Sequence, residues 1–564
     1  MKLDILIITY NSSKWLDNCI NSIMASDYNM KDITLIFLDN MSTDNTVSVL
    51  KKYQKKYKSQ LNDFIVKENY KNDGFGIGNN KAAELGKSPY LFIYNVDTEM
   101  YPDTLKKIDR EISQHEPKVV MWELRQEPFE HPKYYDPVTN YTSWASGACV
   151  IIKREVFEAI GGFDKNIFMY CEDVDLSWAV RARDYKIKYL PSIPIQHFSY
   201  GDGNQFKINQ FFYGFFSNWY LRAKYGSFRR FAGGAVTMAR LAKGYFIPIY
   251  LDSNTKRKIR RKALGHLIKY FPKYFFINRK KKSSDFTPTF KELDFETQGE
   301  GAFYLPEKIN KKPLVSIIVR TCNRPEALRE ALTSISRQSY SNYEVIVVED
   351  GEPHSREMIK NEFGYLNINY YCAGKNQGRS KAGNIGMKLA KGKYFNFLDD
   401  DDAFYYNHIE VLVDYMERNQ INIAYSAAFE TKIDITSRSP YKYKVKSVNT
   451  FVDKHFSKNK LYKRNFIPIQ SIMFNKEVFE KKGGFDEEIE FLEDWDLWIR
   501  YSLDNYFYYV DKTTSVFRTP YQPEDYKKRQ EALDASIDYL KRKFEKYIPK
   551  KTVLDYYMDD ENDS

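Results

Sequence analysis

Four consecutive aspartates, Asp399, Asp400, Asp401 and Asp402, are the residues of this chain whose type and spacing most clearly indicate chemistry. They follow the apolar run 394–398, which is typical of a buried strand. Because adjacent carboxylates repel one another, such a run indicates a bound cation or, alternatively, a solvated acidic turn. A divalent cation there would hold a diphosphate, and the acidic pair Glu493 and Asp494 could supply a general base. This combination favours metal-assisted transfer of a sugar from a nucleotide donor.

The first part of the chain has strand-like runs that end in polar side chains. The run 3–10 contains Thr9 and is followed by Asn11, the run 33–38 is followed by Asp39, and the run 90–94 is followed by Asn95. Helical spacing between these runs predicts a parallel sheet with right-handed crossovers. Ligands of such sheets bind beyond the carboxyl ends of the strands. Asp39 could therefore accept hydrogen bonds from a ribose or a base, or it could simply cap the next helix.

The same order of landmarks occurs twice along the chain. Strand ends, an acidic motif, a Gly-Gly-Phe-Asp segment and a Glu-Asp pair follow one another in both halves. A shared order is stronger evidence than any single motif and predicts duplication of a whole domain. The first copy contains Thr9, Asn11, Asp39, Asp97, residues 161–164, Glu172 and Asp173; the second contains Thr321, Asn323, Glu349, Asp350, the aspartate run, residues 483–486, Glu493 and Asp494.

These motifs resemble those of inverting family-2 glycosyltransferases, which have the GT-A fold. The resemblance implies an α/β fold class with two Rossmann-like, nucleotide-binding GT-A domains in tandem. The first copy is similar to the rhamnosyltransferase-like branch, whose metal motif reads Asn-Pro-Asp. Here the motif is Asn95, Val96 and Asp97, so only Asp97 remains as a carboxylate. The second copy is similar to typical Asp-x-Asp members.

The resemblance also implies the roles of individual residues. It assigns the catalytic base to Asp173, with Glu172 orienting it or sharing the role, and to Asp494 beside Glu493. It assigns a divalent cation, Mn²⁺ or Mg²⁺, to Asp97, His197, Asp401 and Asp402. The donor-binding residues that it implies are Thr9, Asn11, Asp39, Asn95, Thr321, Asn323, Glu349, Asp350, Arg379, Asp399 and Asp400. Considered without the resemblance, a Glu-Asp pair at a helix start also suits a simple cap, and a lone histidine is often structural.

Charge is concentrated in the middle of the chain. Residues 221–282 hold 18 lysines or arginines and one acidic residue, Asp252, so they carry a net charge of +17 while the whole chain carries +11. Aromatic residues lie among these basic ones, which suits an anionic membrane surface or a packed helical connector with a solvated basic face. No nucleic-acid-binding motif occurs, so nucleic acid is not an expected partner.

Length and composition set the remaining expectations. A chain of 564 residues is too long for one core. Five cysteines without metal-binding spacing favour a reducing compartment. No leader and no apolar run long enough to span a bilayer are evident, so we expect a cytoplasmic protein or one peripheral at the inner face of the cell membrane. The expected parts are glycosyltransferase domain 1 (1–205), a basic aromatic helical connector (206–282), a linker (283–312), glycosyltransferase domain 2 (313–520), and a C-terminal helix with an acidic tail (521–564).

Three functions are compatible with these patterns. The first is a bifunctional inverting glycosyltransferase that uses nucleotide-sugar donors, UDP- or dTDP-sugars, and a glycan or lipid-linked glycan acceptor, in the synthesis of a bacterial surface polysaccharide. In the second, only domain 2 is catalytic and domain 1 binds the acceptor. The third is a nucleotidyltransferase, which also uses acidic metal ligands; the absence of a Walker-type phosphate loop argues against it.

Overall fold

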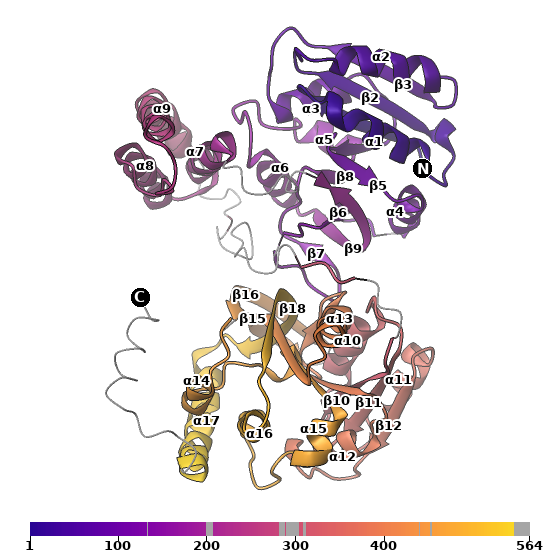
Figure 1. Ribbon diagram of the computed structural model, residues 1–564, viewed down its shortest axis with the longest axis vertical. Coiled ribbons are helices and arrows are strands. Elements are labelled where there is room, and N and C mark those ends of the chain that lie inside the picture. Colours follow the sequence, from indigo (N-terminus) through magenta and orange to yellow (C-terminus); the bar gives the residue numbers. More distant parts are fainter. Residues whose placement is uncertain are drawn as a thin grey trace. The chain divides into compact units, whose positions relative to one another are not determined.

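The computed structural model describes residues 1–114, 116–131, 133–198, 207–280, 288, 304–307, 312–438, 440–451 and 454–545. The chain forms two compact units, unit 1 (Met1–Thr297) and unit 2 (Gln298–Ser564), which are drawn in Figure 1. Most of the expected linker 283–312 and the expected acidic tail lie outside the described residues.

Unit 1 is built on a nine-stranded mixed sheet. Its path runs β3-β2-β1-β4-β8-β6-β9-β5, with β7 paired to β9. The first four strands of this path are parallel, and β8 joins β4 antiparallel. The strands are β1 (Leu3–Thr9), β2 (Ile33–Asp39), β3 (Asp63–Glu68), β4 (Tyr90–Tyr94), β5 (Thr98–Met100), β6 (Val119–Glu127), β7 (Tyr141–Thr142), β8 (Cys149–Lys153) and β9 (Lys186–His197).

Helices cover both faces of this sheet because its parallel strands are apolar on both sides. Ile5 and Ile7 of β1 pack in one cluster with α1, α2 and α4, whereas Leu6 packs in another with α3, α5 and α6. The helices are α1 (Ser13–Met24), α2 (Thr46–Tyr57), α3 (Phe75–Ala83), α4 (Thr104–Ser113), α5 (Arg154–Ala159) and α6 (Glu172–Arg181), with a 3-10 turn at Met30–Asp32.

The eight strands along the path of the unit 2 sheet repeat those of unit 1 in order, whereas its ninth strand pairs with a different neighbour. Its path is β12-β11-β10-β13-β17-β15-β18-β14, with β16 paired to β15. This repetition confirms the predicted α/β class and the predicted duplication. The strands are β10 (Val315–Thr321), β11 (Tyr343–Glu349), β12 (Ile368–Cys372), β13 (Tyr394–Asp399), β14 (Ala403–Phe404), β15 (Ile423–Arg438), β16 (Tyr441–Phe451), β17 (Ile472–Asn475) and β18 (Tyr508–Pro520).

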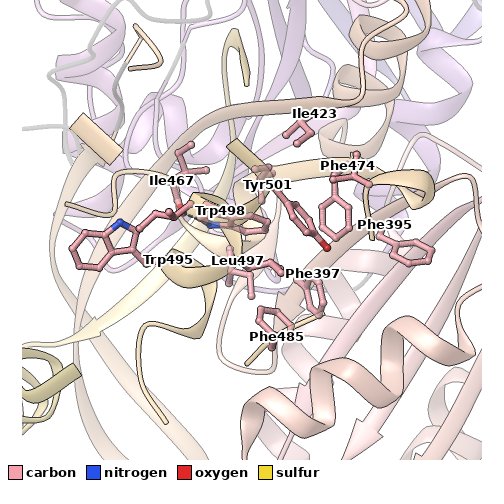
Figure 2. Close-up of a cluster of buried hydrophobic side chains, with 14 of the residues drawn as sticks. Phe395, Phe397, Ile423, Ile467, Phe474, Phe485, Trp495, Leu497, Trp498 and Tyr501 are labelled. Carbon is pink, nitrogen blue, oxygen red and sulfur yellow. Dashed lines mark hydrogen bonds between the residues drawn. The ribbon is translucent and has the colours of Figure 1, made fainter. Parts of the chain in front are cut away.

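The largest core cluster of unit 2 fixes the helix that begins with the acidic pair. Figure 2 shows Trp495 and Trp498 of that helix, α16, in a cluster with Phe397 and Phe474 of the sheet. Burial of such aromatic side chains is worth roughly 1.5–3 kcal/mol each. The helices of unit 2 are α10 (Pro325–Ser336), α11 (Arg356–Phe363), α12 (Arg379–Leu389), α13 (His408–Asn419), α14 (Lys458–Lys463), α15 (Lys476–Lys482), α16 (Glu493–Ser502) and α17 (Pro523–Phe544), with a 3-10 turn at Ile469–Ser471.

The basic segment forms three helices, α7 (Ile208–Tyr225), α8 (Phe228–Lys243) and α9 (Ser253–Lys280), which Figure 1 shows beside α6. Their aromatic side chains share a hydrophobic cluster with Trp178 of α6. Within the described residues, no helix is both long enough and apolar enough to span a bilayer.

Helices α7 and α17 occupy equivalent places in the two copies. Lys224 of α7 donates to Asp164 and Asp175 at 2.7 Å each. Lys543 of α17 donates to Asp486 and Asp496 at 2.6 Å each. In both units one lysine therefore joins the Gly-Gly-Phe-Asp segment to the helix of the acidic pair.

Candidate active site

The predicted donor residues of unit 2 gather at one edge of its sheet. Thr321 is paired with Glu349 across β10 and β11, and Arg320 is paired with Asp399 across β10 and β13. Because these strands are parallel, their carboxyl ends meet at the same edge, where open α/β sheets bind ligands. Just beyond Thr321, Asn323 has a φ of +54°, and the matching Asn11 of unit 1 has a φ of +50°.

Two of these carboxylates are already hydrogen-bonded within the chain. Glu349 accepts from the backbone N–H and hydroxyl of Ser355, at 3.0 Å each, and from the Tyr370 hydroxyl at 2.5 Å. Asp350 accepts from the backbone N–H groups of Gln377 (2.7 Å) and Gly378 (2.9 Å). Asp350 thereby fixes the loop that leads into α12.

That loop positions Arg379, the residue predicted to contact a phosphate of the donor. Arg379 is the first residue of α12, and its guanidinium lies 5.3 Å from the centre of the Phe491 ring. A helix start and an arginine together suit a phosphate group. The donor-binding roles of Arg379 and of the other strand-end residues stay predictions.

Two arginines that the sequence analysis did not identify pair with three of the four aspartates. Arg320 donates to both carboxylate oxygens of Asp399, at 2.8 and 2.9 Å, and its third nitrogen donates to Glu493 at 2.7 Å. Arg324 donates to Asp400 at 3.0 Å and to Asp401 at 2.9 Å. These arginine side chains therefore relieve part of the repulsion within the run. The available signal for Arg320 was that it is the one charged residue of the buried strand β10.

The carboxylates of the run differ in their proton affinity. Burial alone would raise the pKa of Asp399, but Arg320, with smaller effects from Arg379 and Arg324, holds this pKa below its usual range. Burial, with the nearby charge of Asp401, raises the pKa of Asp400 to about 7. Burial and Asp401 also raise the pKa of Asp402 well above its usual range. Near neutral pH, protons therefore compete with any cation for part of this run.

The predicted base of unit 2 lies at the start of α16. Leu492, just before the acidic pair, has a φ of +65°, which turns the chain sharply into the helix. Asp494 accepts from the Asn465 amide at 2.8 Å and from the Trp495 N–H at 2.8 Å. Burial and the adjacent Glu493 raise the pKa of Asp494 to about 7. A carboxylate with such a pKa suits general-base catalysis near neutral pH.

The strand ends of unit 1 form a smaller polar cluster. The Thr9 hydroxyl donates to Asp39 at 2.9 Å, and Asp39 also accepts the backbone N–H of Ser42 at 2.8 Å. The Asn11 side chain accepts the backbone N–H of Thr43 at 2.8 Å. Asn95 follows β4, and its backbone N–H donates to the Ala148 carbonyl at 2.9 Å. These four predicted donor residues are thus held at the sheet edge by contacts within the chain.

The structure brings the two predicted metal ligands of unit 1 together. Asp97 precedes β5 and His197 ends β9, and these strands are paired. His197 Nε2 lies 3.5 Å from Asp97 Oδ1, while His197 Nδ1 lies 2.7 Å from Gln126 Oε1. A hydrogen bond at Nδ1 leaves Nε2 directed at the carboxylate, the orientation that a metal-binding histidine needs.

The acidic pair of unit 1 is buried at the start of α6. Asp173 accepts the backbone N–H of Gly147 at 2.9 Å and that of Val174 at 2.8 Å. Burial and the neighbouring Asp173 raise the pKa of Glu172 to about 8, and burial also raises the pKa of Asp173. Among the described residues, Glu172 Oε2 has no hydrogen-bond partner. Glu172 therefore favours its neutral form, whereas its counterpart Glu493 is paired with Arg320.

Lys133 is a second residue that the sequence analysis missed. It is buried, forms an ion pair with Glu123 and donates to the Trp144 carbonyl at 2.8 Å. Its ammonium group lies 4.6 Å from the centre of the Trp144 ring, and its charge favours ionisation of Asp173, whose pKa burial raises. It lies on an irregular segment after β6, so no periodic pattern marked it in the sequence.

The side chains that each unit offers to a hard divalent cation are too few to bind it without further ligands. Among the described residues, no three His, Cys, Asp or Glu side chains form a group that could hold a metal ion. Unit 1 offers the neighbouring Asp97 and His197, and unit 2 offers Asp401 and Asp402. Divalent cations of this kind accept further oxygens from water and phosphates.

This arrangement defines a tandem GT-A glycosyltransferase: two copies of one nucleotide-binding fold, each with polar strand ends and an acidic pair at the start of a helix. The family model "Glycosyl transferase family 2" matches residues 4–175 and 316–482. The chain therefore belongs to glycosyltransferase family 2. This membership disfavours the nucleotidyltransferase alternative.

Relatives of the chain include uncharacterized glycosyltransferases. One from Rickettsia prowazekii is 35% identical over 197 residues, which are 34% of this chain and 58% of the relative. One from Methanocaldococcus jannaschii is 30% identical over 218 residues, which are 37% of this chain and 72% of the relative. The chain thus matches less than two thirds of the length of the Rickettsia relative.

Solved structures show weaker likenesses. Staphylococcus aureus TarS 1-349 is 16% identical with a TM-score of 0.33, covering 49% of this chain and 83% of that one. A mannosyltransferase from Pyrobaculum calidifontis, solved with GDP-Man and Mn²⁺, is 15% identical with a TM-score of 0.32, covering 49% of this chain and 84% of that one.

Proposed function

We propose that the protein is a bifunctional, metal-dependent, inverting glycosyltransferase of the hexosyltransferase type. It would transfer sugars from UDP- or dTDP-sugar donors to a growing glycan or lipid-linked glycan, in the synthesis of a bacterial capsule, O-antigen or cell-wall glycan. The observation that supports this most is that both units carry an acidic pair at the start of the equivalent helix. Burial raises the pKa of the predicted base, Asp173 or Asp494, in both.

The proposed reaction is a single displacement. The acceptor hydroxyl attacks the anomeric carbon, its proton passes to Asp494 or Asp173, and the bond to the diphosphate breaks as the nucleoside diphosphate takes the electron pair. A bound divalent cation supplies positive charge to the leaving diphosphate. Asp401 with Asp402, or Asp97 with His197, would hold this cation. Attack opposite the leaving group inverts the anomeric centre.

A second candidate keeps catalysis in unit 2 and makes unit 1 an acceptor-binding module. The observation that favours it is the composition of the unit 1 site. Because Thr9 and Thr321 occupy the same place in the repeat, Ile8 stands where unit 2 has Arg320, and Asn95 stands where it has Asp399. Unit 1 therefore has fewer charged groups near the expected diphosphate.

Product analysis of two variants separates these candidates. Asp173→Asn and Asp494→Asn keep the shape of the side chain but remove the base, so each should slow its own transfer step by roughly 10²–10⁴-fold. The exposed Asp184 and Asp504 provide matched controls, Asp184→Asn and Asp504→Asn. With both donors present, each base variant alone should stop elongation after one type of sugar, and a mixture of the two variants should restore it. If Asp173→Asn builds chains at the wild-type rate, unit 1 is not catalytic and the acceptor-module candidate replaces the bifunctional one.

A further inference from the structure

The turn between α8 and α9 presents large apolar side chains within a dense group of cations. We define the hairpin tip as residues 240–261, which hold seven lysines or arginines and one acidic residue, Asp252. Tyr245, Phe246, Ile249 and Tyr250 are exposed by 62, 51, 92 and 77% respectively. Four such side chains in six residues are costly to keep in water and indicate a contact surface.

The backbone of the hairpin tip is fixed by side chains of the same hairpin. Gly244, with a φ of +104°, ends α8, and Arg260 donates to the Ala242 carbonyl at 3.1 Å. Lys256 donates to the Ile249 carbonyl at 2.6 Å. Asp252 accepts the backbone N–H groups of residues 254 (2.8 Å) and 255 (3.0 Å), so its negative charge caps α9. The turn therefore has a defined shape, and several of its backbone N–H and carbonyl groups are hydrogen-bonded within the chain.

The apolar surface continues along α9. Leu264 and Ile268 are exposed and recur at helical spacing, on a different face from the buried Ile259 and Ala263, while Phe271 is partly exposed and packs against Phe231 of the core. In a soluble helix of a bundle, apolar side chains of this periodicity face the core. Leu264 and Ile268 therefore extend the exposed apolar surface of the hairpin tip along α9.

We propose that the hairpin tip docks on an anionic lipid bilayer. Tyr245, Phe246, Ile249 and Tyr250 would enter the boundary between headgroups and acyl chains, and the basic side chains around them would contact anionic headgroups. Charge complementarity selects this occupant, since the tip carries a net charge of +6. An aliphatic side chain at its most exposed position suits an acyl interior better than a base or a phosphate. The inference deepens the proposed function, because it names the surface at which a lipid-linked acceptor would be met.

Vesicle binding by the full chain, without donor or acceptor, tests this proposal separately from any transfer activity. Vesicles of phosphatidylcholine with about 30 mol% phosphatidylglycerol should bind the protein, and vesicles of phosphatidylcholine alone should bind it much more weakly. Ile249→Ser combined with Tyr250→Ser should lower the partition coefficient by about tenfold or more, because these side chains lose their apolar burial. Tyr365→Ser, at a tyrosine that is 71% exposed in unit 2, is the matched control and should bind as the wild type does.

Two further measurements identify the element that inserts. The chain has seven tryptophans, so the emission of Ile249→Trp is compared with that of the wild type: the added emission should shift to shorter wavelength on addition of anionic vesicles and should be quenched by brominated lipid. Arg257→Glu with Arg261→Glu should weaken binding by about tenfold or more, whereas Lys52→Glu with Lys55→Glu on α2 should change it little. Equal binding to both kinds of vesicle, no vesicle binding, or binding that the hairpin variants leave unchanged would overturn the proposal. So would retention of single-stranded nucleic acid in place of vesicles.

Discussion

Replacing Arg320 by methionine should destabilise unit 2 far more than the loss of an ordinary surface ion pair. The Arg320 and Glu493 side chains are 6 and 4% exposed, and Arg320 also pairs with Asp399. Methionine would keep much of the volume between Phe397 and Phe485, whose ring centres lie 5.7 and 5.5 Å from the guanidinium carbon. Two carboxylates would then lack their cation. Breaking a buried pair in this way costs roughly 3–5 kcal/mol.

The measurement is urea and thermal unfolding of the full chain, in which the two units can unfold in separate transitions. For a unit of this size, Arg320→Met should lower the melting temperature of the unit 2 transition by roughly 10 °C. Arg329 and Glu362 form an exposed pair at 2.7 Å and provide the control. Arg329→Met should cost less than about 1 kcal/mol.

A second substitution separates the charge effect from a simple packing defect. Glu493→Gln in the Arg320→Met background should recover part of the lost stability, because it removes an uncompensated buried charge. Lower pH should recover it too, because protonation neutralises a buried carboxylate that has lost its arginine partner. If Arg320→Met unfolds like the wild type, or if neither the second substitution nor acid restores stability, the reasoning is wrong.

Three other predictions concern the metal and the two acidic pairs. Arg324→Ala removes the guanidinium group that pairs with Asp401, so Mn²⁺ should bind at least about tenfold more tightly in titrations without donor. Asp401→Asn should abolish this binding. Unchanged Mn²⁺ affinity in Arg324→Ala would contradict the assignment of Asp401 as a metal ligand. The transfer rate of unit 2 should rise with pH through about pH 7. Burial and Glu493 raise the pKa of Asp494 to about 7, and only the ionised form of Asp494 accepts the proton. A flat pH-rate profile across this range would contradict the role of Asp494 as the base. Burial raises the folded-state pKa of Glu172 to about 8, so its contribution to stability is present below its ordinary pKa and is lost as pH rises to about 8. Glu172→Gln should therefore gain stability relative to the wild type as pH rises over that range. A difference in unfolding free energy that does not change with pH would count against this.

The duplicated fold was predictable from the sequence because its signals are local. A run of apolar residues that ends in Thr9 or Thr321 predicts a strand and its polar end without knowledge of any distant residue. The same holds for the acidic pairs, each of which is followed by a helical pattern. The ion pairs were not predictable in this way: Arg320 meets Asp399 and Glu493, which lie 79 and 173 residues further along the chain. Such contacts depend on how strands and helices pack.

The two units differ at two neighbouring strand-end positions, and the two differences fit each other. At the positions of Arg320 and Asp399, unit 1 has Ile8 and Asn95, so a cation and its carboxylate are absent together. Loss of the carboxylate alone would have left a buried arginine without its main partner. This would lower the stability of the unit by roughly 3–5 kcal/mol. His197 Nε2 lies 3.5 Å from Asp97 Oδ1, whereas Asp401 of unit 2 is paired with Arg324. We therefore expect the two units to differ in metal affinity and donor preference, and the product analysis of Asp173→Asn decides whether unit 1 transfers a sugar.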